Sequence, residues 1–416
     1  CSALLRAMKL ERSKEWWMKM IEREGDYEIG AGLPGPIPET FRRLATVRKI
    51  DEVLPIEGAD KIEAVRIDGW MCVVSKGEFQ AGDLCIYFEI DSFLPVGESH
   101  PHFEFLRKRA IKWDGKEGCR IKTIRLRGQI SQGIAMPLSA FFNSPSETQV
   151  NLMYLKEGDD VTAALRVEKW EKPIPAQLAG QAKGGLPAGI PKTDQERVQN
   201  MGRTLSRLRG QDARDMEYNM NREMHAQAFP EIKFEITTKL DGSSMTVYLL
   251  RDRSFGVCSR NLDLVRSDGN AFWAYVIREN LEARMNEMAD EFGTAFEGFA
   301  LQGELIGPGI QGNAEKLTQT EFFVFDIYSL GGPVGVGYYR PADRRRLCEK
   351  YNFTHVPFLG IISLSELPDL DAFKAWSKGD SLTPGVPREG VVFKATENGQ
   401  IHFKCINDEW LLVNEQ

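Results

Sequence analysis

The chain has 416 residues, of which 42% are hydrophobic and 27% charged, and its formal net charge is −7. This length exceeds one ordinary core, so we expect two or three domains, and no apolar run approaches the roughly 20 residues of a membrane span. The acidic balance confines any nucleic-acid site to a local basic patch. The seven cysteines form no CxxC pair and no Cys/His cluster, which disfavours zinc and indicates an intracellular, reducing compartment, cytoplasmic or nuclear.

The N-terminal third of the chain changes pattern near residue 40. Residues 1–40 combine an amphipathic helical stretch with the helix-breaking GAGLPGPIP at 30–38, so we expect a helical or irregular extension. Residues 41–168 contain short strand-like segments such as WMCVVSK and LCIYFEID. Several short strands within about a hundred residues are typical of a small β-barrel, and the OB-fold is the commonest such module. The pattern therefore predicts an OB-like β-barrel.

A linker and a second domain follow. The stretch EKPIPAQLAGQAKGGLPAGIPK (171–192) is rich in Pro, Gly and Ala, and we place a linker at residues 169–192. Residues 193–416 mix helical and strand patterns, so an α+β domain is expected. Its clearest helix is predicted from about Asp268 to Phe292, because apolar residues recur there at helical spacing. The apolar stripe comprises Phe272, Val276, Ile277, Leu281, Met285 and Met288.

Lys239 lies inside a predicted strand, in the stretch EITTKLDGSSMTVYLL (235–250). Alternation places Lys239 and Asp241 on the same face. A nucleophilic lysine must lose its proton near neutral pH, which a dry site or a neighbouring positive charge such as a metal favours. Asp241 can hold a metal or its waters, and Gly242 leaves room for the ligand. The pattern suits a lysine that attacks phosphorus beside Mg²⁺; a salt bridge at a strand edge is the alternative.

Four further segments place a charged residue inside an apolar strand: LQGELIG (301–307), FFVFDIY (322–328), EGVVFK (389–394) and IHFKCIN (401–407). Charged side chains rarely occupy such positions unless they are paired or functional. Any one of them suits a structural pair, but four in one domain favour a shared site. The last two segments flank Asn398-Gly399, a strong hairpin signal. A two-residue loop would set Phe393 opposite Lys404, and a three-residue loop would set Val392 there.

These motifs and their order resemble the covalent nucleotidyltransferases, the superfamily of ATP-dependent DNA and RNA ligases and mRNA-capping guanylyltransferases. The resemblance rests on KLDG (239–242), SRNL (259–262), QGELIG, FFVFDI, EGVVFK and HFKCIN, and it covers about residues 190–416. It implies an ATP-grasp-like ligase domain of antiparallel sheets with flanking helices, at residues 193–416. The stretches IEGADKIEAVRIDGW, GDLCIYFEIDSFLP, RLRGQISQGIAMPL and PKTDQERVQN resemble the RNA ligase branch that carries an N-terminal OB module. Members of that branch seal nicks whose 3′-OH strand is RNA.

The resemblance implies a three-step reaction. Lys239 attacks the α-phosphate of ATP to give lysyl-AMP and pyrophosphate, the AMP passes to a 5′-phosphate end, and a 3′-OH end then displaces it. The implied cofactors are ATP and Mg²⁺ or Mn²⁺, and the implied partner is RNA or a nicked RNA/DNA duplex bound by a monomer. Metal binding is implied for Asp241, Glu304 and Glu389. Contacts to ATP or AMP are implied for Thr238, Lys239, Asp241, Ser244, Arg260, Glu304, Phe325, Val392, Lys394, His402 and Lys404, with Phe325 and Val392 on either side of adenine.

Three positions depart from the family pattern. Ser244 stands where many DNA ligases have Arg, and Thr238 stands where many relatives have Glu. His402 takes the place of a lysine that the family often carries in its last motif. Because histidine titrates near physiological pH, this change would make a phosphate contact pH-dependent.

A basic strip in the OB-like module is the candidate nucleic-acid surface. Residues 107–127 contain nine Lys or Arg against two acids, with Trp113 among them. Such a composition suits backbone contacts and base stacking, and a solvated basic hairpin is the alternative. The candidate nucleic-acid-binding residues are Arg107, Lys108, Arg109, Lys112, Arg125 and Arg127.

Other functions stay open at this point. Capping-type guanylyltransferases and DNA ligases place an OB domain after the last motif, and only 12 residues follow Lys404 here. A non-catalytic OB-containing RNA-binding protein is a further alternative. The retained set of Lys239, Asp241, Glu304, Glu389 and Lys404 argues against it.

Overall fold

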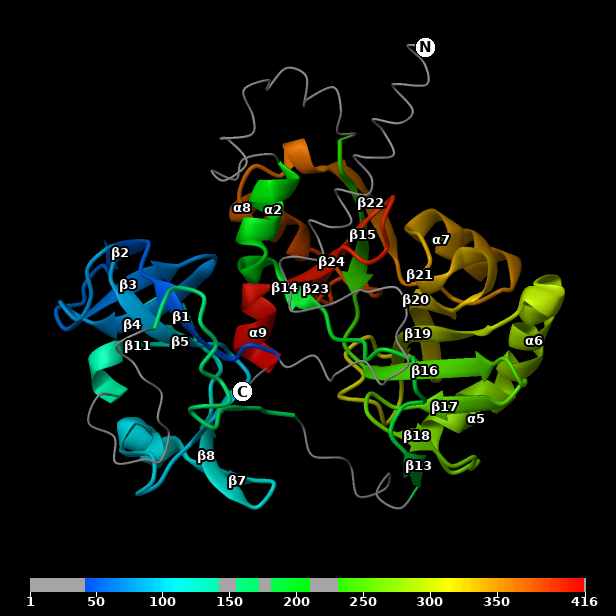
Figure 1. The fold of residues 1–416 in the computed structure, drawn as a ribbon, viewed down its shortest axis with the longest axis horizontal. Helices are drawn as coiled ribbons and strands as arrows, with labels where there is room; N and C mark the ends of the chain where they lie inside the picture. Colours follow the sequence, from blue (N-terminus) through cyan, green and yellow to red (C-terminus); the bar gives the residue numbers. More distant parts are fainter. Residues whose placement is uncertain (1–41, 142–154, 172–180, 210–230, 415–416) are drawn as a thin grey trace, which may run out of the picture.

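The structure is a computed structural model that describes residues 42–141, 155–171, 181–209 and 231–414. Three sheet-based parts lie side by side: the N-terminal module, a central five-stranded sheet and a seven-stranded sheet (Figure 1). The extension predicted for residues 1–40 lies outside the described residues. No helix among the described residues combines the length and the apolar content that crossing a membrane requires.

The N-terminal module consists of short antiparallel strands. Its centre is β5 (Leu84–Phe88), which pairs with β1 (Ala45–Lys49) and β11 (Ile134–Pro137). The other strands are β2 (Glu52–Pro55), β3 (Ile62–Ile67), β4 (Trp70–Ser75), β6 (Ser92–Pro95), β7 (Ile111–Trp113), β8 (Lys116–Arg120), β9 (Thr123–Leu126), β10 (Gln129–Gln132) and β12 (Glu168–Lys169), with 3₁₀ segments η1 (Pro101–Arg109) and η2 (Leu138–Phe141). They confirm the predicted OB-like module, although hydrogen bonding among the described residues divides it into four small sheets.

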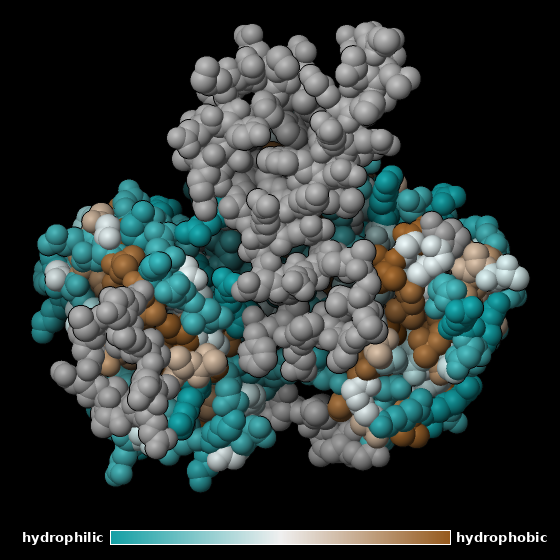
Figure 2. All heavy atoms as spheres, viewed as in Figure 1, coloured by the Kyte–Doolittle hydropathy of each residue, from teal (hydrophilic) through white to brown (hydrophobic). Residues whose placement is uncertain are grey.

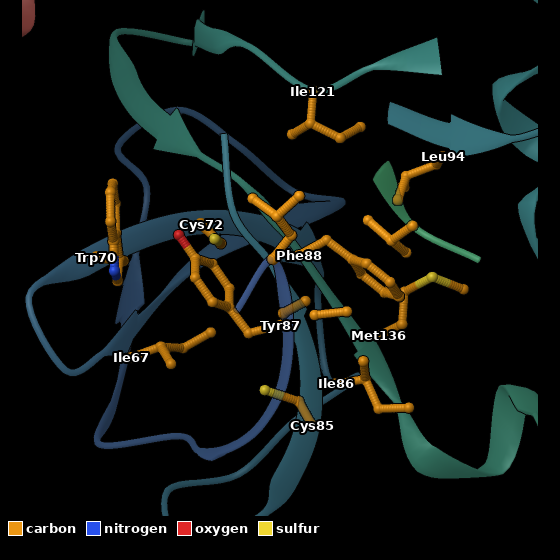
Figure 3. Packing of buried hydrophobic residues seen from close by; sticks show 14 of the residues in the cluster. Ile67, Trp70, Cys72, Cys85, Ile86, Tyr87, Phe88, Leu94, Ile121 and Met136 are labelled. Atoms are coloured by element: carbon orange, nitrogen blue, oxygen red, sulfur yellow. The ribbon is translucent and has the colours of Figure 1, made fainter. Parts of the chain in front are cut away.

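The core of this module is aromatic and aliphatic. Trp70, Tyr87 and Phe88 point into one interior together with Ile86 and Met136 (Figure 3). Burying one such large side chain contributes about 1.5–3 kcal/mol. The same core includes Ile406 and Leu411 from the end of the chain, so it joins the module to the rest of the protein. Removing the module would therefore expose a hydrophobic surface of the remaining protein.

The seven-stranded sheet is antiparallel and carries two helices on one face. Its order is β13 (Ala182–Gly184), β18 (Asp263–Leu264), β17 (Phe255–Cys258), β16 (Ser243–Leu250), β19 (Gly298–Ile306), β20 (Glu321–Leu330) and β21 (Val336–Tyr338). Helices α5 (Ala271–Arg278) and α6 (Leu281–Glu291) pack on it through side chains such as Trp273 and Met285. Residues 182–184, which fall in the expected linker, thus form an edge strand of this sheet.

The single long helix predicted from Asp268 to Phe292 is wrong. Asn280 adopts a left-handed backbone conformation with φ of 49° and separates α5 from α6. Asparagine tolerates this conformation better than most residues. The break changes the direction of the chain, and Ile277, which was expected in the apolar stripe, is 43% exposed.

The five-stranded sheet has one apolar and one charged face. Its order is β14 (Glu196–Arg197), β24 (His402–Ile406), β23 (Gly390–Ala395), β15 (Lys233–Lys239) and β22 (Phe358–Ser363). Phe234, Phe393 and Phe403 pack against Phe373 of α8 (Leu370–Ser377). The remaining helical segments are α2 (Gly202–Leu208), α7 (Pro341–Lys350), α9 (Asp408–Asn414), η4 (Val198–Asn200), η5 (Gly293–Ala295), η6 (Gly332–Val334) and η7 (Leu364–Glu366).

The hairpin between β23 and β24 takes one of the two registers left open by the sequence. Val392 lies opposite Lys404, as expected for the three-residue loop. The bulge expected at Gly399 is absent, because this residue does not have a positive φ. A Cβ atom on Gly399 would lie 2.8 Å from the carbonyl oxygen of Tyr339, so glycine allows close packing on the neighbouring chain.

The outer surface is mostly hydrophilic on the face shown in Figure 2. On the face shown in Figure 2, hydrophilic residues cover most of both lobes, and hydrophobic atoms are gathered in smaller patches beside the undescribed residues. Among the described residues, most large apolar side chains are buried.

Candidate active site

Lys239 is the last residue of β15 and lies on the charged face of the five-stranded sheet. Its strand neighbour is Gly390 of β23, and the residue before that glycine is Glu389. The Nζ atom of Lys239 donates to Oε2 of Glu389 over 2.5 Å. The side chains of Lys239 and Glu389 are 26% and 12% exposed. The lysine is thus accessible at the end of its strand while a carboxylate orients its amine.

Gly242 joins this strand to the seven-stranded sheet. A Cβ atom here would lie 2.4 Å from the carbonyl oxygen of Leu305, so a side chain would push β16 away from β19. The amide of Gly242 donates to Oε1 of Glu304 over 3.1 Å. The glycine was expected to leave room for a ligand; in the structure it permits close strand packing and holds Glu304 beside the lysine.

Three carboxylates shape the electrostatics around Lys239. Burial lowers the pKa of Lys239, but Glu389, Glu304 and Asp241 outweigh it and leave that pKa above its ordinary value. Burial, together with Glu389 and Asp241, raises the pKa of Glu304 to about 8. The residues alone therefore do not favour the neutral amine that the sequence led us to expect. The site carries an excess of acidic groups that suits a further cation.

The acids fit a hydrated divalent cation. No group of three or more His, Cys, Asp or Glu within the described ranges is arranged to hold a metal by itself. Mg²⁺ usually keeps several waters and takes only one or two carboxylates together with substrate phosphates. Asp241, Glu304 and Glu389 supply oxygen donors of that kind, and the pKa of Glu304 is raised first by burial and then by the two neighbouring carboxylates.

Cationic groups face this site from β24 and β14. Lys404 lies beside Arg197 in the parallel pairing of these strands. Burial, together with the charges of Arg197 and Arg42, lowers the pKa of Lys404 to about 7, although Asp194 acts in the opposite direction. Lys404 forms no ion pair with any described residue, and the Nε and Nη1 atoms of Arg197 have no hydrogen-bond partner among them. Unpaired buried donors are costly, so this pair suits an anionic ligand.

A buried ionic network connects the two sheets behind these groups. Lys394 is 3% exposed and binds Asp326 of β20. Arg344 of α7 binds both Asp326 and Glu235. Burial and Arg344 lower the pKa of Lys394 to about 8, although Asp326 raises it. Two of the charges found inside apolar strands are therefore already paired with each other.

Sequence profiles and solved structures identify the family of the chain. The RNA ligase family profile matches residues 232–406, and an OB-fold domain profile matches residues 44–138. A ligand-free variant of the Naegleria gruberi RNA ligase is 38% identical, with a TM-score of 0.75 and coverage of 90% of this chain and 98% of that one. This chain belongs to the RNA ligase family. No curated protein matches it.

Two more structures of that Naegleria gruberi enzyme contain ligands. A variant with AMP and Mn has a TM-score of 0.76 and 38% identity over 90% of this chain and 99% of that one. A variant with ATP and Mn has a TM-score of 0.75 and the same identity over 90% and 100%. These matches confirm the predicted RNA ligase family, its N-terminal OB-fold domain and its α+β ligase domain.

In this RNA ligase family member, the predicted site residues separate into groups. The structure brings Lys239, Glu304 and Glu389 together, with Asp241 close enough to influence their charges. The hydroxyl of Ser244 lies 2.7 Å from that of Thr193. Thr238 is buried opposite Val391, so strand alternation turns its side chain to the apolar face. Contact of that side chain with ATP is not favoured by this geometry.

Two other predicted ATP contacts are engaged with protein groups. Arg260 donates to Asp194 over 2.7 Å, and Asp194 also accepts from Lys169 over 2.6 Å. The ring of His402 packs edge-on against Tyr338 at 5.2 Å between centroids. Burial lowers the pKa of His402 to about 4, with a further contribution from Lys394. His402 was expected to titrate near neutral pH because of its residue type. In the structure the pKa of Lys404, and not that of His402, lies near neutrality.

The candidate adenine-stacking residues occupy the seam between the sheets. The register of β19 and β20 shifts so that Val324 and Asp326 pair with neighbouring residues and Phe325 is skipped. This β-bulge re-aims Phe325 into a cluster with Leu240, the residue after the nucleophile candidate. Val392 is half-buried on the same sheet face as Lys404. Stacking on adenine stays a prediction for both.

Arg197 is the main site residue that the sequence reasoning missed. It lies in PKTDQERVQN, a stretch that contributed only to the resemblance with the RNA ligase branch. An arginine in a short two-residue strand carries no periodic signal. Its place beside Lys404 arises from parallel pairing with a strand that lies about 200 residues later in the chain.

Proposed function

We propose that this protein is an ATP-dependent ligase that joins a 3′-OH end to a 5′-phosphate end, at nicks whose 3′-OH strand is RNA. The observation that supports it is that Lys239 lies between a group of carboxylates and a pair of cationic side chains. The amine is held by Glu389 over 2.5 Å, acids lie beside it, and the unpaired donors of Arg197 and the amine of Lys404 lie on the same sheet. This arrangement suits a nucleophile, a hydrated cation and a triphosphate.

The first step forms a bond from Nζ of Lys239 to the α-phosphorus of ATP and breaks the α–β bridging bond, so that pyrophosphate leaves. Oε2 of Glu389 is placed to hold a proton of Nζ and to keep the amine directed. An oxygen of the 5′-phosphate then attacks the AMP phosphorus and breaks its bond to Nζ, so that Lys239 is released and the end is adenylated. The 3′-OH finally attacks the phosphorus of the 5′-phosphate and expels AMP. Each step is a displacement at phosphorus, in which positioning and charge neutralisation contribute most of the rate.

The metal proposed for this site is Mg²⁺ or Mn²⁺, held by Asp241, Glu304 and Glu389 directly or through water. When bound, it would offset the negative phosphates and the carboxylates that raise the pKa of Lys239. Lys404 and Arg197 would neutralise phosphates from the other side.

Two measurements test the proposed function. Intact mass after incubation with Mg²⁺ and either ATP or GTP should show a gain of one AMP and no gain of GMP; the opposite result would favour a guanylyltransferase. Sealing of an RNA-terminated nick and an all-DNA nick should then be compared side by side. We expect faster sealing of the RNA-terminated nick, and equal rates would favour a DNA ligase.

ATP affinity should weaken as the pH rises from 6 to 8.5. Lys404 has a pKa of about 7 in the free protein, so it is charged below that pH and mostly neutral above it. Phosphate binds the charged form, and the affinity should fall by up to about tenfold per pH unit above this pKa. Calorimetric titration of ATP into the unreactive Lys239→Ala variant measures binding without chemistry.

Lys404→Arg is the control for this pH dependence. Arginine keeps its charge throughout this range, so the variant should bind ATP with a flatter pH profile. Protonation of ATP itself contributes equally to both proteins, and the difference between the two profiles isolates Lys404. Identical profiles would show that Lys404 does not titrate in contact with the phosphates.

The basic strip on the OB module supports contact with nucleic acid. Lys108, Arg109 and Lys112 are exposed and form no ion pair with described residues, whereas Arg107 binds Glu104. The aromatic ring available for stacking is Phe105, which is 59% exposed. Trp113 is instead engaged: it packs on Phe93 and donates to the backbone oxygen of Glu171.

Arg125 and Arg127, two other residues of the predicted strip, lie apart from residues 107–109 in the chain and have different surroundings. Arg125 donates to Glu409 of α9 over 2.7 Å, so it bridges the OB module and the C-terminal helix. Arg127 is exposed at the turn between β9 and β10, where its φ is 49°. The nucleic-acid role is therefore best tested at residues 107–109.

Neutralising Arg107, Lys108 and Arg109 together to alanine should weaken binding of a nicked duplex and flatten its salt dependence. The slope of log K against log salt is negative, and each lost phosphate contact reduces its magnitude by about 0.9. Because Arg107 is partly neutralised by Glu104, we expect a change nearer to two contacts than three. Binding measured between about 50 and 200 mM salt checks this.

The matched control is the triple variant Lys49→Ala, Lys61→Ala and Lys76→Ala. These lysines are also exposed on the OB module but lie outside the strip, and the variant changes the net charge equally. An unchanged slope in the strip variant, or the same change in the control, would leave the strip as an ordinary solvated face.

A further inference from the structure

The segment from Glu196 to Asn200 lies between the OB module and strand β24 of the five-stranded sheet. On one side β14 pairs with β24 and sets Arg197 beside Lys404. On the other side it touches the turn between β3 and β4. A Cβ atom on Gly69 would lie 2.7 Å from Cα of Gln199, so the two backbones are in close contact. The OB module thus forms one wall of the strand that carries Arg197.

Polar groups of the OB module hold the end of this segment. Asn200 donates from Nδ2 to Oε1 of Glu89 over 2.7 Å. Its Oδ1 accepts from the indole of Trp70 over 2.8 Å and from Arg48 over 3.1 Å. Glu89 is 1% exposed, and Arg42 and Arg48 balance its charge. A half-buried amide with all these partners has little freedom to move.

Asp91 of the OB module contacts Arg197 itself. Its Oδ2 atom accepts from Nη2 of Arg197 over 3.3 Å, and its Oδ1 atom accepts from Arg120 over 2.8 Å. Arg42 lies 3.8 Å from the same carboxylate. The side chain of Arg197 is 6% exposed. Asp91 therefore holds one end of a buried guanidinium whose other donors, Nε and Nη1, have no partner among the described residues.

We propose that Asp91 is a positioning residue for the reaction with ATP, which orients Arg197 so that its unpaired donors meet the phosphates beside Lys404. The inference rests on the proposed function, since it needs ATP at this site. It assigns the OB module a part in forming lysyl-AMP, in addition to any contact with nucleic acid. A planar guanidinium fixed at one edge offers its remaining N–H groups in a defined direction.

Asp91→Asn is the variant that tests this role. Asp91 has a φ of 69°, and asparagine tolerates this left-handed conformation as well as aspartate does. The change removes the charge that holds Arg197 with little change in volume. We expect the ATP concentration for half-maximal lysyl-AMP formation to rise about tenfold, as for loss of one charge-assisted hydrogen bond. The maximal rate should change less.

The control is Glu52→Gln, which breaks an exposed ion pair with Arg66 over 3.0 Å inside the OB module, on strands β2 and β3 that do not pair with β14. It should behave as wild type. Sealing of a pre-adenylated nick uses no ATP, so Asp91→Asn should leave it nearly unchanged. Thermal unfolding of each variant verifies folding, and Asp91→Gly, which also accepts a positive φ, provides a second test of the lost carboxylate.

A double-mutant cycle with Arg197→Ala decides whether Asp91 acts through Arg197. The effect of Asp91→Asn should vanish in the Arg197→Ala background. Additive effects, or an equal loss in sealing of the pre-adenylated nick, would overturn the inference in favour of a general interface role. If wild type gains no AMP, the proposed function fails. If wild type gains AMP and Asp91→Asn matches it at every ATP concentration, only this inference fails.

Discussion

Lys239→Ala should gain no AMP when it is incubated with ATP and Mg²⁺, whereas the wild-type protein should gain the mass of one AMP. The amine of Lys239 is the group placed to attack phosphorus: it ends its strand on the charged face, stays partly accessible, and is oriented by Glu389 over 2.5 Å. Loss of a nucleophile removes the covalent route, and we expect the rate to fall by about 10³-fold or more. Intact mass spectrometry measures this directly.

The matched control is Lys233→Ala at the other end of β15. Lys233 is exposed, and its strand partner is Ser363 of the edge strand β22. This variant should gain AMP as wild type does. Uptake of AMP by Lys239→Ala would transfer the nucleophile to another residue and refute the assignment.

Glu389→Ala and Glu304→Ala should both fold and both lose sealing. Glu389 holds the nucleophile, and Glu304 accepts from the amide of Gly242 beside it. Removal of a group that stabilises charge at the reacting centre costs about 10²–10³-fold in rate. Lysyl-AMP formation and sealing of an RNA-terminated nick should be measured for each variant, together with its thermal unfolding.

The pKa of Glu304 provides a stability test of the same assignment. Its value in the folded protein is raised to about 8, so the fold favours the protonated form and Glu304 opposes folding increasingly as the pH rises from its ordinary value through 8. Glu304→Gln should therefore unfold at pH 8 at a temperature no lower than wild type while it loses activity. A strongly destabilised Glu304→Gln would instead assign Glu304 to the structural core.

Glu321→Ala is the control for these acidic variants. Glu321 starts β20, pairs with Ile306 in the sheet and lies 3.9 Å from Arg278 at the surface side of the domain. Its removal takes one carboxylate from the same sheet without touching Lys239. Both activities should stay within about twofold of wild type, because this long, partly exposed ion pair has a small energetic value.

The proposal for Asp91 changes the division of labour expected from the sequence. The sequence suggested that the N-terminal module binds nucleic acid while the second domain performs the chemistry. The shared core that includes Ile406 and Leu411, and the contact of Asp91 with Arg197, make the module part of the site's wall. Point variants are therefore a cleaner test than deletion of the module.

Local patterns were sufficient to find the strands and the groups that carry charge on them. Alternation in EITTKLDG placed Lys239 and Asp241 on one face, and Asn398-Gly399 marked the final hairpin. The order of the short motifs indicated the covalent nucleotidyltransferases, and the N-terminal stretches narrowed the resemblance to the RNA ligases, the family that the comparisons confirm. Period and turn chemistry act over a few residues, so a single sequence expresses them directly.

Other features needed the packed structure. The break at Asn280 depends on how α5 and α6 both reach the same core, and the role of Gly242 depends on the carbonyl of Leu305 about 60 residues away in the chain. Phe325 was found in sequence, but its direction comes from a bulge in β20.

The charges of the site show most clearly what the sequence determines and what the tertiary structure adds. The sequence by itself determined which residues are ionisable, and it marked Lys239, Glu304, Glu389 and Lys404 as charges in unusual places. Only the tertiary structure decided that the pKa of Lys239 is raised and that of Lys404 is lowered, because each shift sums burial and partners brought together from distant strands. The same reason hid Arg197: its neighbours Lys404 and Asp91 adjoin it only after the OB module and the last hairpin have packed on either side.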